Sequence, residues 1–183
     1  MKRSALRRAL AVLEADGKIW RHVGRGTFTG MRPAADQSTL TLVARQTSPA
    51  EVMGVRLVIE PATAALAARH ATAEQIEHMH ACVRKSRTTT DVNTYELWDS
   101  HLHRGIAEAA GNALLLAVFN AVNAIRQENI WGSLKEATLT CERQAAYSRQ
   151  HLAIVKAIGA RDAPEAEQRM RAHLETVRRD LVG

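Results

Sequence analysis

Four polar residues occupy positions whose helical neighbours are apolar: Asp99, His103, His151 and His173. Asp99 and His103 are four residues apart, so on a helix their side chains lie on the same face. Burying three imidazoles and a carboxylate without a partner costs several kcal/mol, and a bound metal ion would remove that cost. We therefore interpret the four residues as candidate ligands of a divalent cation. Ordinary core or surface histidines are the alternative.

The spacing of the last two histidines is compatible with a shared metal site. His151 stands eight residues before Gly159, and His173 stands nine residues after Pro164. If the flanking segments form an antiparallel helical hairpin, both histidines lie about 12 to 13 Å from its turn, at about 1.5 Å per residue. Two histidines at one height, facing Asp99 and His103, can converge on a cation. With three nitrogen donors, one oxygen donor and no thiolate, Zn, Ni, Fe and Mn are all admissible.

These candidate ligands require helices to position them, and the sequence predicts a mainly helical chain. Most segments show an apolar period of 3.6 residues. Ser48 and Glu51 form a capping-box pattern that opens a long helix ending near His70. Further helices are predicted at residues 73–87, 93–110, 112–131, 138–158 and 163–181. The expected fold class is all-α, with an antiparallel helical bundle over residues 49–183.

Positive charge is concentrated at the N-terminus. Residues 1–30 carry seven Lys and Arg against two acidic residues, which is +5 of the net charge of +6. This asymmetry indicates an anchor for a polyanion, either nucleic acid or an anionic membrane. The segment predicts a helix at residues 3–16 and a short hairpin, followed by a linker at residues 31–48. A solvated amphipathic helix beside a short hairpin is the alternative. The candidate DNA-binding residues are Arg3, Ser4, Arg7, Arg8, His22 and Arg25.

Cysteine content and hydropathy indicate the compartment. Cys82 and Cys141 are too few for a disulfide scaffold, and we expect both to be small buried thiols in a reducing environment. No apolar run approaches the roughly 20 residues that a bilayer requires. The expectation is a soluble, cytoplasmic protein without a membrane partner.

Residues 4–30 read SALRRALAVLEADGKIWRHVGRGTFTG. This segment resembles the recognition helix and wing of GntR-type winged helix-turn-helix repressors. The resemblance implies that Arg3 and Arg7 contact bases or phosphates of operator DNA, and that the hairpin tip reaches the adjacent groove. It also implies that residues 1–30 are a partial module, because the family has two helices and a short strand before this segment. Either the start codon is placed too far downstream or the chain is a genuine truncation. The matching positions are Arg3, Leu6, Arg7, Ala9, Leu10, Leu13, Gly17, Gly24, Gly26, Thr27 and Phe28.

Residues 49–181 carry the motifs Arg56-Leu-Val-Ile-Glu60, Asp99-Ser-His-Leu-His103 and His173-Leu174. With these motifs they resemble the FCD-type effector-binding domain of the FadR-like branch of this family. In metal-binding members, an Asp and three His hold a divalent cation at the base of a pocket, and the resemblance implies this role for the four residues above. It also implies that Arg56 binds the carboxylate of a small organic acid; an i,i+4 pair with Glu60 is the alternative. Asn112 is a candidate effector contact or a helix N-cap. The shared motifs are Arg56-Leu-Val-Ile-Glu60, Asp99-Ser-His-Leu-His103, Ala110-Gly111-Asn112, residues 151–158 and His173-Leu174.

Together these features predict a homodimeric transcriptional regulator and not an enzyme. Residues 49–183 would bind a divalent metal and a small carboxylate effector, dimerise, and change the affinity of the N-terminal module for operator DNA. One alternative is a dimerising, ligand-binding fragment without DNA binding. Another is a metal-dependent hydrolase, since a metal with open positions could activate water. The hydrolase is disfavoured because the sequence has no H-E-x-x-H motif and no evident general base beside the ligands.

Overall fold

The structure is a computed structural model that describes residues 3–16, 18–22, 26–29, 42–44, 46–126 and 138–182. The chain divides into two compact units, Met1–Thr41 and Leu42–Gly183, and each is described by itself. No helix within the described ranges is long and apolar enough to cross a membrane. The finer domain limits given above, at residues 30 and 48, stay predictions.

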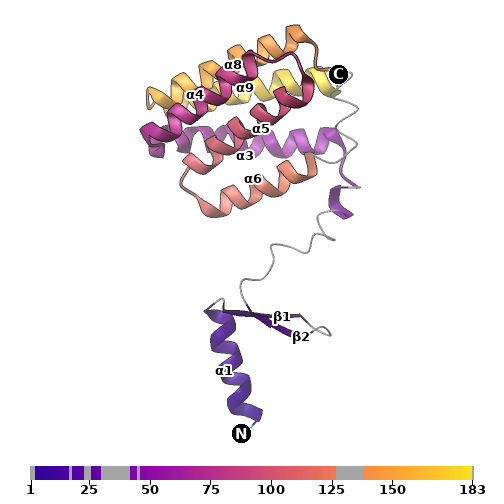
Figure 1. The fold of residues 1–183 in the computed structure, drawn as a ribbon, viewed down its shortest axis with the longest axis vertical. Helices are drawn as coiled ribbons and strands as arrows, with labels where there is room; N and C mark the ends of the chain where they lie inside the picture. The colour runs from indigo at the N-terminus through magenta and orange to yellow at the C-terminus, as the bar shows by residue number, and fades with distance from the viewer. Residues whose placement is uncertain are drawn as a thin grey trace. The chain divides into compact units, whose positions relative to one another are not determined.

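The N-terminal unit contains a helix and a hairpin, as the sequence predicts (Figure 1). Helix α1 spans Arg3–Ala15, and the antiparallel strands β1 and β2 span Ile19–His22 and Gly26–Thr29. Ile19 is the one buried side chain among those described in this unit, while Leu6 and Val12 on α1 are exposed. The described part of the unit therefore has very little core of its own.

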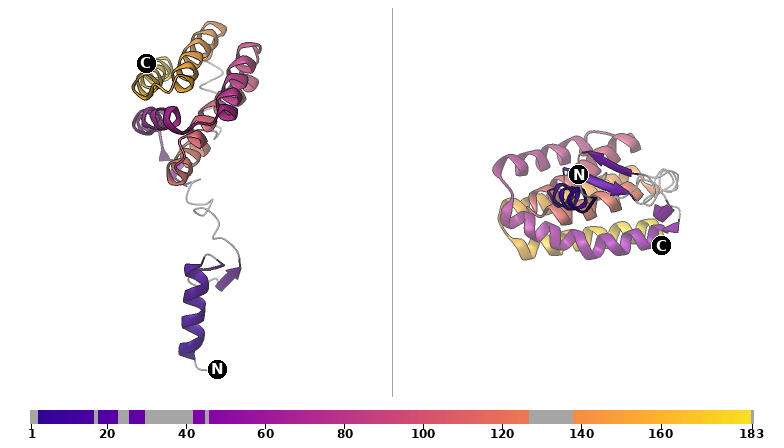
Figure 2. Two further views of the ribbon diagram at one scale, coloured as in Figure 1. Left: turned by 90° about the vertical axis from the view of Figure 1, so that its left-hand side faces the viewer. Right: turned by 90° about the horizontal axis from the view of Figure 1, so that it is seen from below.

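The second unit is a helical bundle, which confirms the expected fold class (Figures 1 and 2). Helix α8 begins three residues later than predicted, because the Thr140 side chain accepts a hydrogen bond from the Arg143 N–H and caps it there. The predicted continuation of α6 beyond Arg126 lies outside the described residues. The helices are α3 (Pro49–His70), α4 (Ala73–Arg87), α5 (Val92–Ala109), α6 (Ala113–Arg126), α8 (Cys141–Gly159) and α9 (Ala163–Val182).

Side-chain caps fix where the helices begin. The predicted capping box is present: the Ser48 hydroxyl accepts from the Glu51 N–H, and the Glu51 carboxylate accepts from the Ser48 N–H at 2.8 Å. The Asp162 side chain accepts from the Glu165 N–H at 3.0 Å and so starts α9 directly after α8 ends at Gly159. The turn between α8 and α9 is therefore only three residues long, which makes the two helices antiparallel neighbours.

The core lies between α3, α5, α8 and α9, with α4 against α5 and α8. Helix α6 packs on α3 and α5 but buries only Phe119 and Arg126 among its own residues. Cys82 is buried as expected, whereas the prediction for Cys141 is wrong: it is the first residue of α8 and is exposed. Side chains that are almost fully buried include Met53, Met79, Leu102, Ile106, Ile154, Ile158, Met170 and Leu174.

Candidate metal centre

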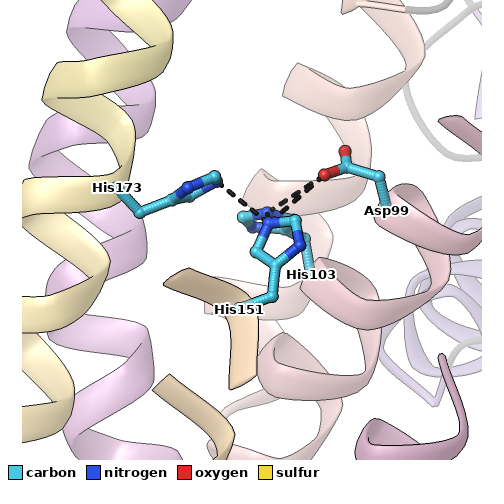
Figure 3. Close-up of side chains that lie close together, drawn as sticks. All are labelled: Asp99, His103, His151 and His173. Carbon is cyan, nitrogen blue, oxygen red and sulfur yellow. Dashed lines mark hydrogen bonds and ion pairs between the residues drawn. The ribbon is translucent and has the colours of Figure 1, made fainter. Parts of the chain in front are cut away.

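Three helices bring the four predicted ligand residues together inside the bundle (Figure 3). Asp99 and His103 come from successive turns of α5, His151 from α8 and His173 from α9. All four side chains are buried, and His151 is 0% exposed. One donor atom from each lies within 4.8 Å of every other. The arrangement has the size of a metal coordination sphere.

The histidines meet through the same ring nitrogen. His151 Nε2 lies 3.0 Å from His173 Nε2 and 3.4 Å from His103 Nε2. Asp99 Oδ1 lies 3.4 Å from His151 Nε2 and 3.7 Å from His103 Nε2. The short α8–α9 turn places His151 and His173 at one height, as the spacing predicts. All four donors therefore surround one central point.

The opposite ring nitrogens fix the tautomer of two histidines. His103 Nδ1 lies 2.6 Å from Glu60 Oε2, and His173 Nδ1 lies 2.8 Å from Gln150 Oε1. Carboxylate and amide oxygens only accept, so the Nδ1 atoms of His103 and His173 each carry a proton, and the Nε2 lone pair of a neutral His173 faces the centre. His151 Nδ1 has no hydrogen-bond partner among the described residues.

Electrostatics keep these groups in the state that a cation needs. Burial lowers the pKa of His151 to about 3 and the pKa of His173 well below its usual value, so both rings are neutral near pH 7. Burial alone would raise the pKa of Asp99, but His103 and Arg126 outweigh it and hold that pKa well below its ordinary range. Neutral imidazoles and an ionised carboxylate are the forms that bind a metal.

Arg126, the last described residue of α6, supports Asp99 from the side away from the histidines. Its Nη1 lies 3.3 Å from Asp99 Oδ2 and 3.2 Å from Glu96 Oε2, and its Nη2 donates to the Ser100 hydroxyl. Asp99 therefore directs Oδ1 to the cluster and Oδ2 to a guanidinium. Arg126 was not predicted as part of the site, because no spacing rule links the end of one helix to a carboxylate 27 residues earlier.

Arg56 is held by Glu60 in a buried ion pair on α3. Burial would lower the pKa of Arg56, but the Glu60 carboxylate raises it overall. Burial would likewise raise the pKa of Glu60, yet Arg56 and His103 together lower it to about 2. Glu60 thus joins Arg56 to the Nδ1 side of His103. The Arg56–Glu60 pair corresponds to the i,i+4 alternative predicted from the sequence, whereas the contact of Glu60 with His103 was not predicted.

A small cavity of about 30 Å³ opens beside the cluster. Tyr95 lines it, and its buried hydroxyl has no hydrogen-bond partner among the described residues. The Tyr147 hydroxyl, in contrast, donates to Asp180 Oδ2 at 2.7 Å. The cavity is lined by Arg56, Tyr95, Glu96, Asp99, Arg126, Thr138, Leu139, Tyr147, His173, Val177 and Leu181.

Asn112, the other predicted effector contact, lies outside the cavity. It is exposed, it is not among the residues lining the cavity, and its side chain accepts from the Leu115 N–H at 3.0 Å at the start of α6. Its position corresponds to the N-cap alternative.

The predicted DNA-binding residues Arg3, Ser4, Arg7 and Arg8 lie on α1 and His22 ends β1, whereas Arg25 falls outside the described residues.

Comparisons with known proteins identify the family of this chain. The FCD domain family matches residues 51–176. A protein of Escherichia coli (strain K12), whose name describes a regulator of the L-lactate dehydrogenase operon, is 30% identical over 97% of this chain and 71% of its own length. The HTH-type transcriptional regulator LutR of Bacillus subtilis (strain 168) is 27% identical over 100% of this chain and 86% of its own length.

Solved structures share the fold. A structure described as the metal-free FCD domain of TM0439 superimposes with a TM-score of 0.58 at 16% identity, covering 82% of this chain and 96% of that one. This likeness concerns the bundle, whose helices carry the Asp99 and histidine cluster. The chain therefore belongs to the GntR family of transcriptional regulators, in the FadR-like branch that carries an FCD domain.

Proposed function

We propose that this chain is a metal-dependent sensor of a small carboxylic acid that controls transcription as a homodimer. Asp99, His103, His151 and His173 bind one divalent cation, and the acid binds in the adjoining cavity. The observation that carries the proposal is the convergence of three Nε2 atoms and one carboxylate oxygen within 4.8 Å. Because the relatives' names describe regulators, we propose regulation and not catalysis.

The donor geometry supports a cation at the centre of the cluster. The Nε2 atoms of His103 and His173 both face His151 Nε2, at 3.4 Å and 3.0 Å, and the Nδ1 protons of His103 and His173 point away from the centre. A divalent ion supplies the missing positive charge, and Zn, Ni, Fe and Mn all accept this donor set. Glu60 and Gln150 hold two of the rings in the binding tautomer, a role that such outer contacts commonly have.

The cavity supports a carboxylate beside the ion. Asp99 and His173 belong both to the cluster and to the cavity wall, so a ligand in the cavity reaches the open face of a bound cation. Arg56 lines the same cavity and is the proposed partner of the carboxylate. The Tyr95 hydroxyl offers a further polar contact. Asn112 has no part in this proposal, because it lies outside the cavity wall.

Regulation requires that acid binding favour one arrangement of the dimer over another. A ligand that binds both arrangements equally shifts neither. The basic N-terminal unit is the proposed DNA-binding element, with Arg3, Ser4, Arg7 and Arg8 on α1 and His22 and Arg25 on the hairpin as candidate contacts. Its net charge of +5 over residues 1–30 supports an interaction with phosphates.

Metal analysis of the purified protein tests the central step. We expect about one divalent ion per chain after dialysis, lost on treatment with a chelator and lost in His151→Ala. His101→Ala is the matched control, because His101 is an exposed histidine on α5 that does not belong to the cluster. Equal metal content in both variants would contradict the proposal.

Calorimetry with and without chelator tests the effector step. Acids of two to six carbons should release heat on binding to the metal-loaded protein and give no signal after metal removal. Binding that is indifferent to the metal would place the effector somewhere other than this cavity.

A further inference from the structure

The hydrogen bonds on the α9 side of the cluster have a fixed direction. The Thr176 hydroxyl donates to the Ala172 carbonyl at 2.9 Å, so its oxygen accepts from Gln150 Nε2 at 3.4 Å. The carbonyl oxygen of Gln150 therefore faces His173 and accepts from its Nδ1 at 2.8 Å. A neutral His173 then offers only a lone pair on Nε2. The next atom is His151 Nε2, 3.0 Å away, and this nitrogen must supply the proton of the contact.

His151 therefore carries its ring proton on Nε2 in the arrangement that the structure shows. Asp99 Oδ1, 3.4 Å from the same nitrogen, is a second acceptor for that proton. A neutral imidazole has one proton, so Nδ1 of His151 is then a bare lone pair. Binding a cation through Nε2 requires the opposite tautomer, with the proton on Nδ1. His173 needs no such change, because its Nδ1 already carries the proton.

Ser148 lies one helical turn before His151 on the buried face of α8. Long side chains of a helix lean over the residues three and four positions earlier, which brings the His151 ring toward Ser148. His151 Nδ1 and Ser148 Oγ are both buried, and neither has a hydrogen-bond partner among the described residues. The hydroxyls of Thr63 and Thr176, in contrast, donate to the carbonyl four residues earlier on their own helices. The Ser148 hydroxyl is not engaged in this way.

A second hydroxyl lies on the other side of Ser148. It belongs to Tyr95, whose pKa burial raises, while the nearby Ser148 hydroxyl acts in the opposite direction. A serine hydroxyl has one donor and two acceptor sites, so Ser148 can contact Tyr95 and His151 at once. Contact with Tyr95 therefore leaves Ser148 able to serve His151.

The outer partners of the three histidines differ in chemistry. The carboxylate beside His103 and the amide oxygen beside His173 only accept, which holds both protons on Nδ1. A serine hydroxyl donates as well as accepts. It can donate to the bare Nδ1 of His151 when the proton is on Nε2, and it can accept from Nδ1–H when Nε2 binds a cation. A hydroxyl is the partner that serves both tautomers.

Resting on the proposed metal site, we propose that His151 changes tautomer when the cation binds, and that Ser148 is the positioning residue that accepts its Nδ1 proton. The Nε2–H bond breaks and an Nδ1–H bond forms. Water carries the proton between the two nitrogens, so the ring stays neutral throughout. His173 keeps one tautomer in both states.

Nitrogen NMR of protein containing isotope-labelled histidine tests the change of tautomer. Long-range correlations within each ring show which nitrogen carries the proton. We expect His151 to have Nε2–H in the metal-free protein and Nδ1–H after addition of one equivalent of Zn²⁺, whereas His173 has Nδ1–H in both. The same tautomer of His151 in both states would overturn the inference while the metal site stands. A failure of Zn²⁺ to bind would overturn the metal site and the inference together.

Ser148→Ala tests the positioning role. Without the hydroxyl, Nδ1–H of His151 has no acceptor in the loaded protein, so we expect Zn²⁺ affinity to fall at least tenfold in competition with a coloured chelator. Thr63→Val is the matched control, because it removes a buried hydroxyl of α3 that belongs neither to the cluster nor to the cavity wall, and it should leave the affinity unchanged. Urea unfolding of the metal-free variants establishes that both are folded. An affinity of Ser148→Ala equal to that of the wild type, or an equal loss in Thr63→Val, would overturn the role of Ser148.

Discussion

Glu60→Gln tests the buried ion pair that supports the site. Glu60 is 3% exposed and accepts from Arg56 Nε and from His103 Nδ1. The substitution keeps the shape and an acceptor for His103, but it leaves Arg56 as a buried cation that has lost its direct partner. Breaking one side of a buried pair costs about 3 to 5 kcal/mol.

Urea unfolding of the metal-free protein measures this cost. We expect Glu60→Gln to lower the free energy of unfolding by about 3 kcal/mol. The double variant Arg56→Met, Glu60→Gln removes both charges, so it should be more stable than Glu60→Gln alone. Arg104 and Glu108 provide the control, because they form an exposed i,i+4 pair at 2.8 Å on α5. Glu108→Gln should cost less than about 0.5 kcal/mol.

Two results would refute this reasoning. If Glu60→Gln costs no more than Glu108→Gln, the Arg56–Glu60 pair is not a buried ion pair in solution. If the loss of unfolding free energy in the double variant equals the sum of the losses in Arg56→Met and in Glu60→Gln, the two residues do not interact. Glu60 then acts on stability through His103 alone.

Three further outcomes are expected. Gln150→Leu should lower metal affinity at least tenfold, because the Nδ1 proton of His173 loses its acceptor at 2.8 Å. Competition with a coloured chelator measures the metal affinity. An unchanged affinity would show that this contact does not orient the His173 ring. Tyr95→Phe should leave the unfolding free energy within about 1 kcal/mol, because the hydroxyl has no partner among the described residues, yet weaken acid binding in calorimetry. A large loss of stability would instead reveal a structural bond. Ser48→Ala should lower the unfolding free energy by about 1 kcal/mol by removing the cap of α3, and an unchanged thermal midpoint would argue against the capping box.

Local periodicity was sufficient to predict most of the helices and the shared faces of the four ligand residues, whereas the resemblance to FCD-type domains was needed to favour a metal site over ordinary histidines. Asp99 and His103 share a face because of their i,i+4 spacing, and the short turn after Gly159 sets His151 level with His173. Both features depend on geometry within one helix or one hairpin. Such geometry is readable without knowledge of how the helices pack.

The contacts that support the cluster could not be predicted in this way. Arg126 and Glu60 reach the site from α6 and α3, and their contacts depend on the packing of helices that are distant in sequence. The burial of Cys141 was predicted from residue type alone, whereas its position at the first turn of α8 decides its exposure. Asn112 belonged to a shared motif, but the motif does not distinguish a helix cap from a ligand contact.

The hairpin of α8 and α9 also restricts how this protein can change in length during evolution. His151 and His173 meet because each stands at a fixed number of residues from a three-residue turn. One residue inserted within either helix between them would rotate a histidine by about 100° and carry it off the inner face. Insertions and deletions that preserve the site are therefore confined, in this stretch, to residues 160–162. Relatives that retain the metal ligands should vary in length at that turn and keep the flanking helical segments constant.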